Sequence, residues 1–253
     1  MTPDQYVSSI VAKYAVPTGT GSPPYLAAQK VIPIIREWAG QWLLGIDYSG
    51  SFAKGTAIHG DADVDLFISL SRETPFTLRD IFNNLVNYFT SRGYSVRQQD
   101  VSVRISLGTI SIDLVPGKKQ AGFGNDHSLY RRSRDSWTLT NVQKHINTVK
   151  GSNRHTEIRA LKIWVLLHGL EFPSFYLELV VLDALAGRST NAPAANFLAC
   201  IRYIGGNLRT ARIVDPSNSN NIVSDDLSLP QKARVATQAF QSAQQVSWGS
   251  IIW

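Results

Sequence analysis

GSFAKGTAIHGDADVDL, residues 50–66, joins a glycine-serine turn to two aspartates separated by one residue. A glycine turn that opens a short helix presents backbone N–H groups to a phosphate, and the Ser51 hydroxyl can add a further donor. Gly50 and Ser51 are therefore candidate phosphate contacts. Side chains two residues apart on a strand leave the same face, so Asp63 and Asp65 are predicted to point the same way.

A third aspartate is predicted to join these two. Apolar and polar residues alternate over 64–70 and again over 110–114, which predicts two half-buried strands. In the second strand the apolar residues occupy one face, so Asp113 lies on the other. Like charges brought together are tolerated in water or around cations, and two-metal phosphoryl transfer uses carboxylates that share ions ~3.5–4 Å apart. Asp63, Asp65 and Asp113 are thus predicted to hold two Mg²⁺ ions, or Mn²⁺, on an open sheet face.

The rest of the chain predicts a mixed α/β half followed by a helical half. Residues 1–24 have the character of a loose lead-in, and residues 117–136 that of a polar surface connection. We therefore expect a catalytic core over 1–139, including a long N-terminal helix, and a helical domain over 140–253. The remaining predicted elements are a strand over 101–107, joined to the next strand by a tight turn at Gly108-Thr109, and several helices. The helices are predicted over 25–44 (with a kink, or a break into two abutting helices, at Pro33), 77–92, 140–150, 156–168, 174–186, 192–208 and 230–246.

Composition narrows the class of protein. The chain has 253 residues, of which 43% are hydrophobic, so it can bury a sizeable core and is not intrinsically disordered. Its net charge of +6 favours polyanionic partners such as nucleotides or nucleic acid. Cys200 is the single cysteine, which excludes an intramolecular disulfide and makes a reducing cytoplasm the simplest compartment. No segment has the pattern of a signal peptide or a membrane-spanning helix, so no membrane partner is expected.

The stretch over 50–66 resembles the signature of the DNA polymerase β-like nucleotidyltransferase superfamily. Within it, the run resembles the branch that holds the oligoadenylate synthetases, cyclic GMP-AMP synthase and the bacterial CD-NTases of the SMODS type. Three later segments are similar to motifs of that branch. They are Arg159-Ala160-Leu161-Lys162-Ile163-Trp164, Pro173-Ser174-Phe175-Tyr176-Leu177-Glu178-Leu179, and Asp215-Pro216 with Asn220-Asn221.

The resemblance implies a fold and a set of residue roles. The fold is α+β: a polymerase β-like nucleotidyltransferase core, with a mixed sheet flanked by helices, joined to a C-terminal helical bundle, with the active site in the cleft between them. The family often has Tyr where this chain has Phe175, so base stacking is kept, a phenolic hydrogen bond is lost and the identity of the base stays open. The implied roles are metal ligation and catalysis for Asp63, Asp65 and Asp113, nucleotide binding for Gly50 and Ser51, triphosphate contact for Lys162 and Ser174, and base stacking for Phe175.

The activity implied is synthesis of a cyclic di- or trinucleotide second messenger from NTPs, ATP among them, with release of pyrophosphate, in CBASS anti-phage defence. A regulatory partner protein or an RNA ligand is compatible with it. A template-independent polymerase that extends RNA ends or makes linear 2′–5′ oligomers would use the same carboxylates. Transfer of AMP to a partner protein and a catalytically silent nucleotide or RNA sensor are further alternatives. The three retained aspartates argue against the sensor, and bases, linkage, product size and oligomeric state stay open.

Overall fold

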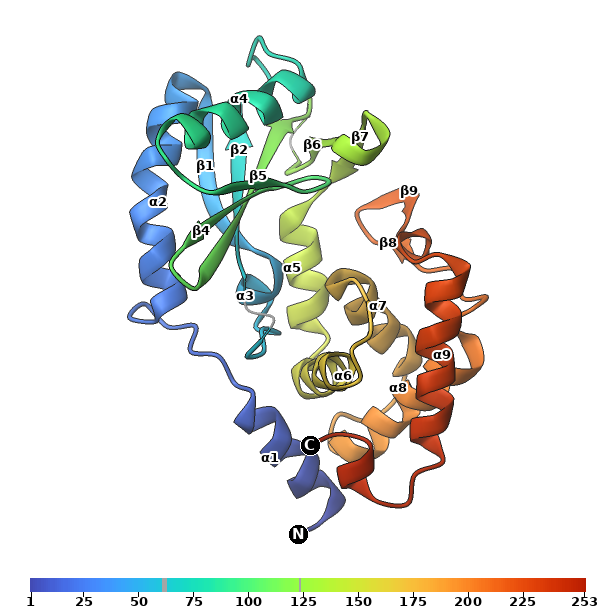
Figure 1. Cartoon of the computed structure of the whole chain (residues 1–253). Coiled ribbons are helices and arrows are strands. Elements are labelled where there is room, and N and C mark those ends of the chain that lie inside the picture. Colours follow the sequence, from blue (N-terminus) through green and yellow to red (C-terminus); the bar gives the residue numbers. More distant parts are fainter. Residues whose placement is uncertain (61–62, 123) are drawn as a thin grey trace. The chain divides into compact units, whose positions relative to one another are not determined.

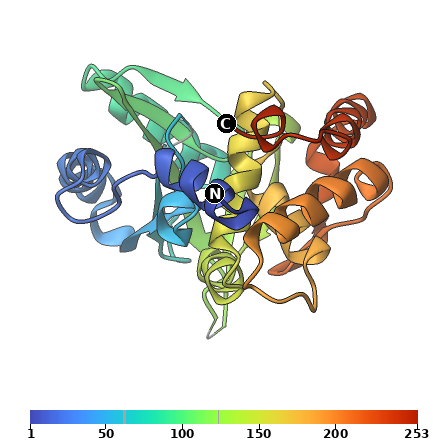
Figure 2. The same cartoon turned by 90° about the horizontal axis from the view of Figure 1, so that it is seen from below.

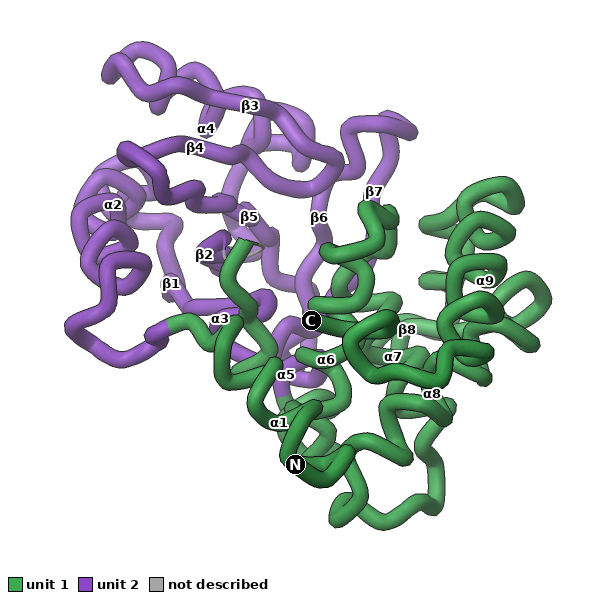
Figure 3. Tube along the Cα trace, turned by 60° about the horizontal axis from the view of Figure 1, so that its bottom comes forward, with its two compact units in different colours: residues 1–16, 55–61, 147–253 green, residues 17–54, 62–146 purple. Residues whose placement is uncertain are grey.

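The structure is a computed structural model that describes residues 1–60, 63–122 and 124–253. Asp61 and Ala62 of the signature stretch, together with Phe123, lie outside the described residues. The chain divides into two compact units, coloured separately in Figure 3. The sheet unit comprises residues 17–54 and 62–146, and the helical unit comprises residues 1–16, 55–61 and 147–253.

A mixed sheet forms the centre of the sheet unit (Figure 1). Its strands are β1 (Leu43–Ser49), β2 (Val64–Leu70), β3 (Val96–Gln98), β4 (Val103–Leu107), β5 (Ile110–Lys119), β6 (His127–Arg131) and β7 (Ser136–Thr140). The order across the sheet is β1-β2-β5-β4-β3, and β6 pairs with β5 and then with β7. β2 and β5 are parallel, whereas β1 is antiparallel to β2, and β4 is antiparallel to β5. The two strands that carry the predicted aspartates are therefore direct neighbours.

Two helices cover one face of this sheet. They are α2 (Pro23–Ala39), which runs unbroken through Pro33, and α4 (Leu78–Ser91), which begins at the predicted N-cap Thr77. Their apolar sides pack against the inward residues of the strands, which are fully buried. Those inward residues include Val64, Leu66, Ile105, Ile112 and Leu114. Because strand side chains alternate, the polar residues between them are left to the opposite face.

Helices dominate the other unit. Its elements are α1 (Pro3–Lys13), α6 (His155–Leu167), α7 (Ser174–Ala184), α8 (Pro193–Asn207), α9 (Leu229–Ala243) and the short strands β8 (Val214–Asp215) and β9 (Asn218–Ile222). Trp164, Tyr176 and Phe197 are fully buried at its centre. The remaining short pieces of the chain are α3 (Gly50–Lys54), α5 (Val142–Gly151), within which the unit boundary falls, and 3₁₀ turns at Gly40–Trp42, Arg132–Arg134, Val223–Asp226 and Trp248–Ser250. Among the described residues, none of the helices has both the length and the apolar content that a membrane crossing requires.

The N-terminal segment departs from the prediction of a loose lead-in. Thr2 and Gln5 form a reciprocal capping box that starts α1. Val7, Ile10 and Val11 then belong to the same buried cluster as α6 and α8, and α1 lies beside these helices (Figure 2). The compact units therefore differ from the predicted boundary at 139/140, because burial of this apolar face joins residues 1–16 to the helical unit.

Two further predictions about the sheet unit were wrong. The helix predicted over 25–44 ends at Ala39, since Gly40 takes a positive φ of 52° and the chain then enters β1. The connection predicted over 117–136 contains β6 and the end of β5, which continues past Pro116 in register with β2. Both corrections matter for the polar face, because β1, β5 and β6 all contribute side chains to it.

Candidate active site

Asp65 and Asp113 lie side by side on the sheet face that α2 and α4 leave uncovered. The two residues are register partners on the parallel strands β2 and β5, which places their backbones about 4.8 Å apart. Asp65 is half-buried and Asp113 is 6% exposed. The alternation predicted from the sequence is thus seen in both strands, with the carboxylates on one face and the apolar residues buried on the other.

Arg104 brings the third carboxylate into this group. Its Nε and Nη2 atoms donate to Oδ1 and Oδ2 of Asp113, each at 2.8 Å, and Nη2 also donates to Oδ2 of Asp63. Gln99 Nε2 donates to Asp113 Oδ1 at 3.1 Å. Because Asp63 and Asp113 share one nitrogen, their oxygens are within two hydrogen-bond lengths of each other, about 6 Å. The structure therefore gathers all three predicted carboxylates around one guanidinium.

The charge of Arg104 is strongly stabilised at this position. Its hydrogen bonds to Asp113 raise the pKa of the guanidinium above its ordinary value, against the effect of partial burial, and the charges of Asp113, Asp63 and Asp65 act in the same direction. We did not predict Arg104 or Gln99 from the sequence. The signal for Arg104 was present, since a two-residue turn at Gly108-Thr109 pairs it with Asp113, and the flanking apolar residues of β4 set it on the carboxylate face.

Gly50 allows Asp65 to lie against the start of α3. Gly50 has a φ of +57°, and a Cβ atom added to it would overlap the Asp65 carboxylate. The next residue, Ser51, is half-buried. The ring of Phe52 stacks on Tyr48 of β1 with centroids 5.4 Å apart, which fixes α3 to the sheet. The predicted phosphate contacts Gly50 and Ser51 thus lie at the start of α3, beside the predicted metal ligand Asp65.

Replacing Gly50 with Ala is expected to abolish catalysis while the protein still folds. The new methyl group would displace the Asp65 carboxylate, and the positive φ would cost about 1–2 kcal/mol of folding free energy. Gly108→Ala is the matched control, because Gly108 has a φ of +61° but nothing within 4 Å of an added Cβ atom. Thermal unfolding should show that both variants are destabilised, Gly50→Ala the more because of the clash with Asp65, and nucleotide turnover should be lost in Gly50→Ala alone. Equal activity would show that Asp65 does not need this contact.

The carboxylates suit a divalent cation in chemistry and in position. Mg²⁺ prefers hard oxygen ligands of the carboxylate type, and the Arg104 guanidinium, bound to two of the three, is itself a cation held at this point. Within residues 1–60, 63–122 and 124–253, no three acidic, histidine or cysteine side chains are already arranged around a metal position. Asp63 and Asp113 instead direct oxygens at Arg104. The residues therefore fit Mg²⁺ or Mn²⁺ if Arg104 gives up the oxygens that it holds.

The other predicted nucleotide contacts lie in the helical unit. Lys162, which is 4% exposed, and Ser174 both line one cavity of about 160 Å³. Phe175 is half-buried and packs against the apolar cluster of this unit, outside the lining of that cavity. Arg159, one turn before Lys162, is used locally: its Nε and Nη2 atoms donate to the carbonyl oxygen of Gly55 at 3.0 and 2.6 Å. The structure brings Lys162 and Ser174 together and gives Arg159 the task of anchoring the segment after α3.

Known proteins resemble this chain in part of its sequence and in its fold. A scan against models of known protein families finds no match. The CCA-adding enzyme of Saccharolobus shibatae is 26% identical over 137 residues, and that of Saccharolobus islandicus is 25% identical over a segment of the same length. Each match covers 53% of this chain but 31% of the enzyme, so the chain spans about a third of these relatives.

Solved structures are similar over nearly the whole chain. Escherichia coli MS115-1 CdnC, in complex with HORMA-deltaN, superposes with a TM-score of 0.75 at 18% identity, covering 95% of this chain and 89% of CdnC. Bradyrhizobium diazoefficiens CdnG, in complex with GTP, superposes with a TM-score of 0.81 at 12% identity, covering 96% of this chain and 90% of CdnG. Elizabethkingia meningoseptica CdnE, a cyclic dinucleotide synthase bound to GTP and Apcpp, superposes with a TM-score of 0.69 at 13% identity, covering 96% of this chain and 99% of CdnE. The chain therefore has the fold of the CD-NTase structures, as the resemblance of residues 50–66 predicts.

Proposed function

We propose that this chain is a nucleotidyltransferase that joins nucleoside triphosphates into a cyclic di- or trinucleotide. A ribose hydroxyl of the acceptor nucleotide attacks the α-phosphate of the donor. The new bond forms between that oxygen and phosphorus, the bond to the leaving pyrophosphate breaks, and the hydroxyl proton passes to Asp113. For a dinucleotide, a second attack, by the free hydroxyl of the linear product on its own α-phosphate, closes the ring and releases a second pyrophosphate. For a trinucleotide, the first step is repeated with a further NTP before the ring closes, and three pyrophosphates are released.

The observation that supports this most strongly is the group of carboxylates around Arg104. Asp65 and Asp113 are partners on adjacent strands, and Asp63 shares a guanidinium nitrogen with Asp113. Two bound Mg²⁺ or Mn²⁺ ions would neutralise phosphate charge and lower the pKa of the attacking hydroxyl. Asp63, Asp65 and Asp113 would hold these ions, and Asp113, beside the acceptor hydroxyl, would accept the proton of that hydroxyl.

We assign the triphosphate of the donor nucleotide to a small set of polar and charged side chains. Ser51, at the start of α3, is proposed to bind the γ-phosphate through its hydroxyl. Lys162 and Ser174, which line one cavity, would contact the remaining phosphate oxygens. Phe175 would stack on the donor base. Catalysis then comes mainly from positioning and from neutralisation of phosphate charge.

The cyclic product is favoured by the solved structures of similar fold. CdnE is described as a cyclic dinucleotide synthase, and CdnC and CdnG are bound to ATP and GTP respectively. We extend to this chain the use of ATP or GTP and a second-messenger role in CBASS defence. The complex of CdnC with HORMA-deltaN supports the further proposal of a regulatory partner protein.

An RNA-end polymerase is the second candidate. The sequence match to CCA-adding enzymes favours it, because those enzymes are 25–26% identical to this chain over 137 residues. A polymerase of this kind would use the same carboxylates but would take an RNA 3′ end as the acceptor. It would therefore extend a labelled RNA primer, which a cyclic oligonucleotide synthase has no need to do.

The deciding experiment supplies all four NTPs with Mg²⁺ and identifies the products by mass spectrometry. We expect release of pyrophosphate and a product that resists phosphatase, because a cyclic nucleotide has no terminal phosphate. A parallel reaction contains labelled RNA, and labelled ATP with protein on a gel detects transfer of AMP to a polypeptide. Primer extension without a resistant product would replace the proposal with the polymerase. Absence of any Mg²⁺-dependent turnover would favour a silent sensor.

A further inference from the structure

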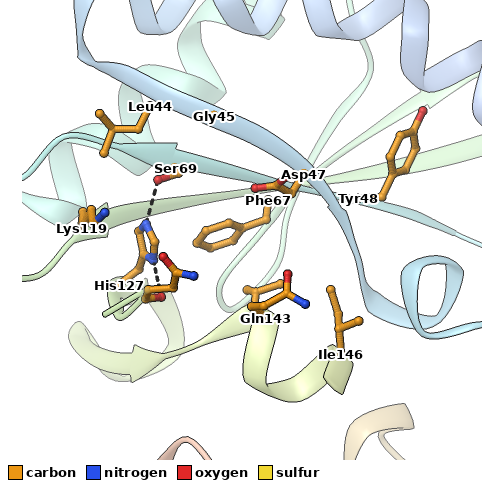
Figure 4. Close-up of a pocket in the computed structure, with 12 residues that line it drawn as sticks. Leu44, Gly45, Asp47, Tyr48, Phe67, Ser69, Lys119, His127, Gln143 and Ile146 are labelled. Atoms are coloured by element: carbon orange, nitrogen blue, oxygen red, sulfur yellow. Dashed lines mark hydrogen bonds between the residues drawn. The ribbon is translucent and has the colours of Figure 1, made fainter. Parts of the chain in front are cut away.

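A cavity of about 320 Å³ opens on the same sheet face as the carboxylates, farther along the strands (Figure 4). β1, β2, β5, β6 and the first turns of α5 surround it. The side chains that matter for its chemistry are Asp47, Phe67, Ser69, Lys119, His127 and Gln143. No step of the proposed reaction so far uses any of them.

The inner part of this cavity is aromatic and uncharged. The ring of Phe67 lies over Gly117, where an added Cβ atom would come within 2.6 Å of it, and meets the His127 ring edge-on with centroids 4.9 Å apart. Burial lowers the pKa of His127, so the imidazole is neutral near pH 7. Its Nδ1 donates to the carbonyl oxygen of Asn125 at 2.9 Å, which leaves Nε2 to accept the Ser69 hydroxyl at 2.8 Å. Aromatic rings that line a cavity and are held in place suit a planar ligand, which can stack on the face of one of them.

The charged groups of the cavity are Asp47 and Lys119. Figure 4 shows them apart, with the rings of His127 and Phe67 between them. Within the described residues the structure gives neither side chain an ion pair or hydrogen bond. A ligand that bridges them needs hydrogen-bond donors on one edge and acceptors on another. Guanine has this pattern, with adjacent N1–H and N2–H donors on one edge and the acceptors O6 and N7 on the other.

The cavity and the carboxylates lie on the same face of β2 and follow one another along this strand. Asp65, Phe67 and Ser69 follow one another at every second residue of β2, so all three face the same side. At about 3.3 Å per residue, Phe67 and Ser69 lie roughly 7 and 13 Å beyond Asp65 along the strand. A nucleotide with its base in the cavity would extend its ribose toward Asp65 and Asp113.

We propose that this cavity binds the guanine base of the acceptor nucleotide. Asp47 accepts from N1–H and N2–H of the base, and Lys119 donates to O6 or N7. The preference against adenine follows from the carboxylate, because adenine presents a ring-nitrogen acceptor where guanine presents N1–H. The role as acceptor site rests on the proposed function, whereas binding of guanine does not.

The test measures equilibrium binding of GMP and AMP to the whole chain without divalent metal, which keeps it independent of catalysis. We expect GMP to bind at least about tenfold more tightly than AMP, and Asp47→Asn to weaken GMP binding by about 10–100-fold with little change for AMP. Lys119→Met should weaken GMP binding severalfold. Hydrogen exchange of the segment 43–49 should slow when GMP is bound to the wild type but not to Asp47→Asn.

Glu73→Gln and Lys30→Met are the matched controls, since both replace exposed charged side chains outside the cavity. They should leave the affinity for GMP unchanged. Equal binding of GMP and AMP by the wild type, no binding of either, or Asp47→Asn with unchanged GMP affinity would each overturn the proposal. Turnover of NTPs with such a result would leave the proposed function standing. Selective binding of GMP without any turnover of NTPs would support the guanine site and count against the proposed function.

Discussion

Replacing Asp113 with Asn is expected to reduce nucleotide turnover by at least about 10³-fold, the scale of loss when a charged group is removed from a phosphoryl-transfer site. The substitution preserves shape and removes both the negative charge and the proton acceptor. Arg104 keeps its contact with Asp63, so the fold should survive with a modest loss of stability. Initial rates of pyrophosphate release, with thermal unfolding of the same samples, measure both effects.

Asp80→Asn is the matched control for that substitution. Asp80 lies in the first turn of α4, on the helix that covers the opposite face of the sheet. We expect this variant to keep wild-type turnover. An Asp113→Asn protein that is folded and retains more than about a tenth of the wild-type rate would remove Asp113 from the catalytic group, given the expected scale of loss.

Replacing Arg104 with Gln is expected to make the stability of the protein depend on divalent metal. Without the guanidinium, Asp63, Asp65 and Asp113 repel one another, and Asp113, whose side chain is only 8% exposed, loses its counter-ion. Loss of one partner from a buried ion pair costs 3–5 kcal/mol, and since the Arg104 side chain is 26% exposed we expect about 2–3 kcal/mol. That corresponds to a decrease in Tm of roughly 4–12 °C. Mn²⁺ should restore most of the lost Tm. It should also bind to the variant about tenfold more tightly than to the wild type, because a competing positive charge is gone.

The experiment compares thermal unfolding with and without Mn²⁺ and measures Mn²⁺ affinity by electron paramagnetic resonance. Arg97→Gln serves as the control, since Arg97 is the exposed cross-strand partner of Arg104 on β3. It should lose little stability and respond to Mn²⁺ as the wild type does. If Arg104→Gln is destabilised and Mn²⁺ does not recover it, Arg104 is a structural residue and does not compete with a metal.

The carboxylate face was predictable because strand side chains alternate strictly. Asp63 and Asp65 flank the buried Val64, and Asp113 lies between two buried residues of β5, so the period alone separates the polar side from the core. Arg104 follows from the same rule together with the turn at Gly108-Thr109. It was missed because a single arginine on a strand also fits an exposed surface.

Other features depended on contacts that local patterns do not show. β1 follows α2 so closely that its apolar residues fit a longer helix, and only the positive φ of Gly40 ends that helix. The cavity beside β1 consequently went unpredicted, because Asp47 and Lys119 come to line one cavity only after the sheet has formed. The boundary of the units was displaced for the same reason, since α1 joins the helical unit by packing against helices far along the chain.

The position of a bound metal is the most direct test of the carboxylate group. Crystals grown with Mn²⁺ and a non-hydrolysable nucleoside triphosphate would locate the metal by its anomalous scattering. We expect Mn²⁺ within about 2.0–2.3 Å of oxygens from Asp63, Asp65 and Asp113, with a phosphate oxygen in its coordination sphere and Arg104 withdrawn from the shared oxygens. Mn²⁺ bound elsewhere, with Arg104 still held by Asp63 and Asp113 beside a bound nucleotide, would contradict the assignment of the three aspartates as metal ligands.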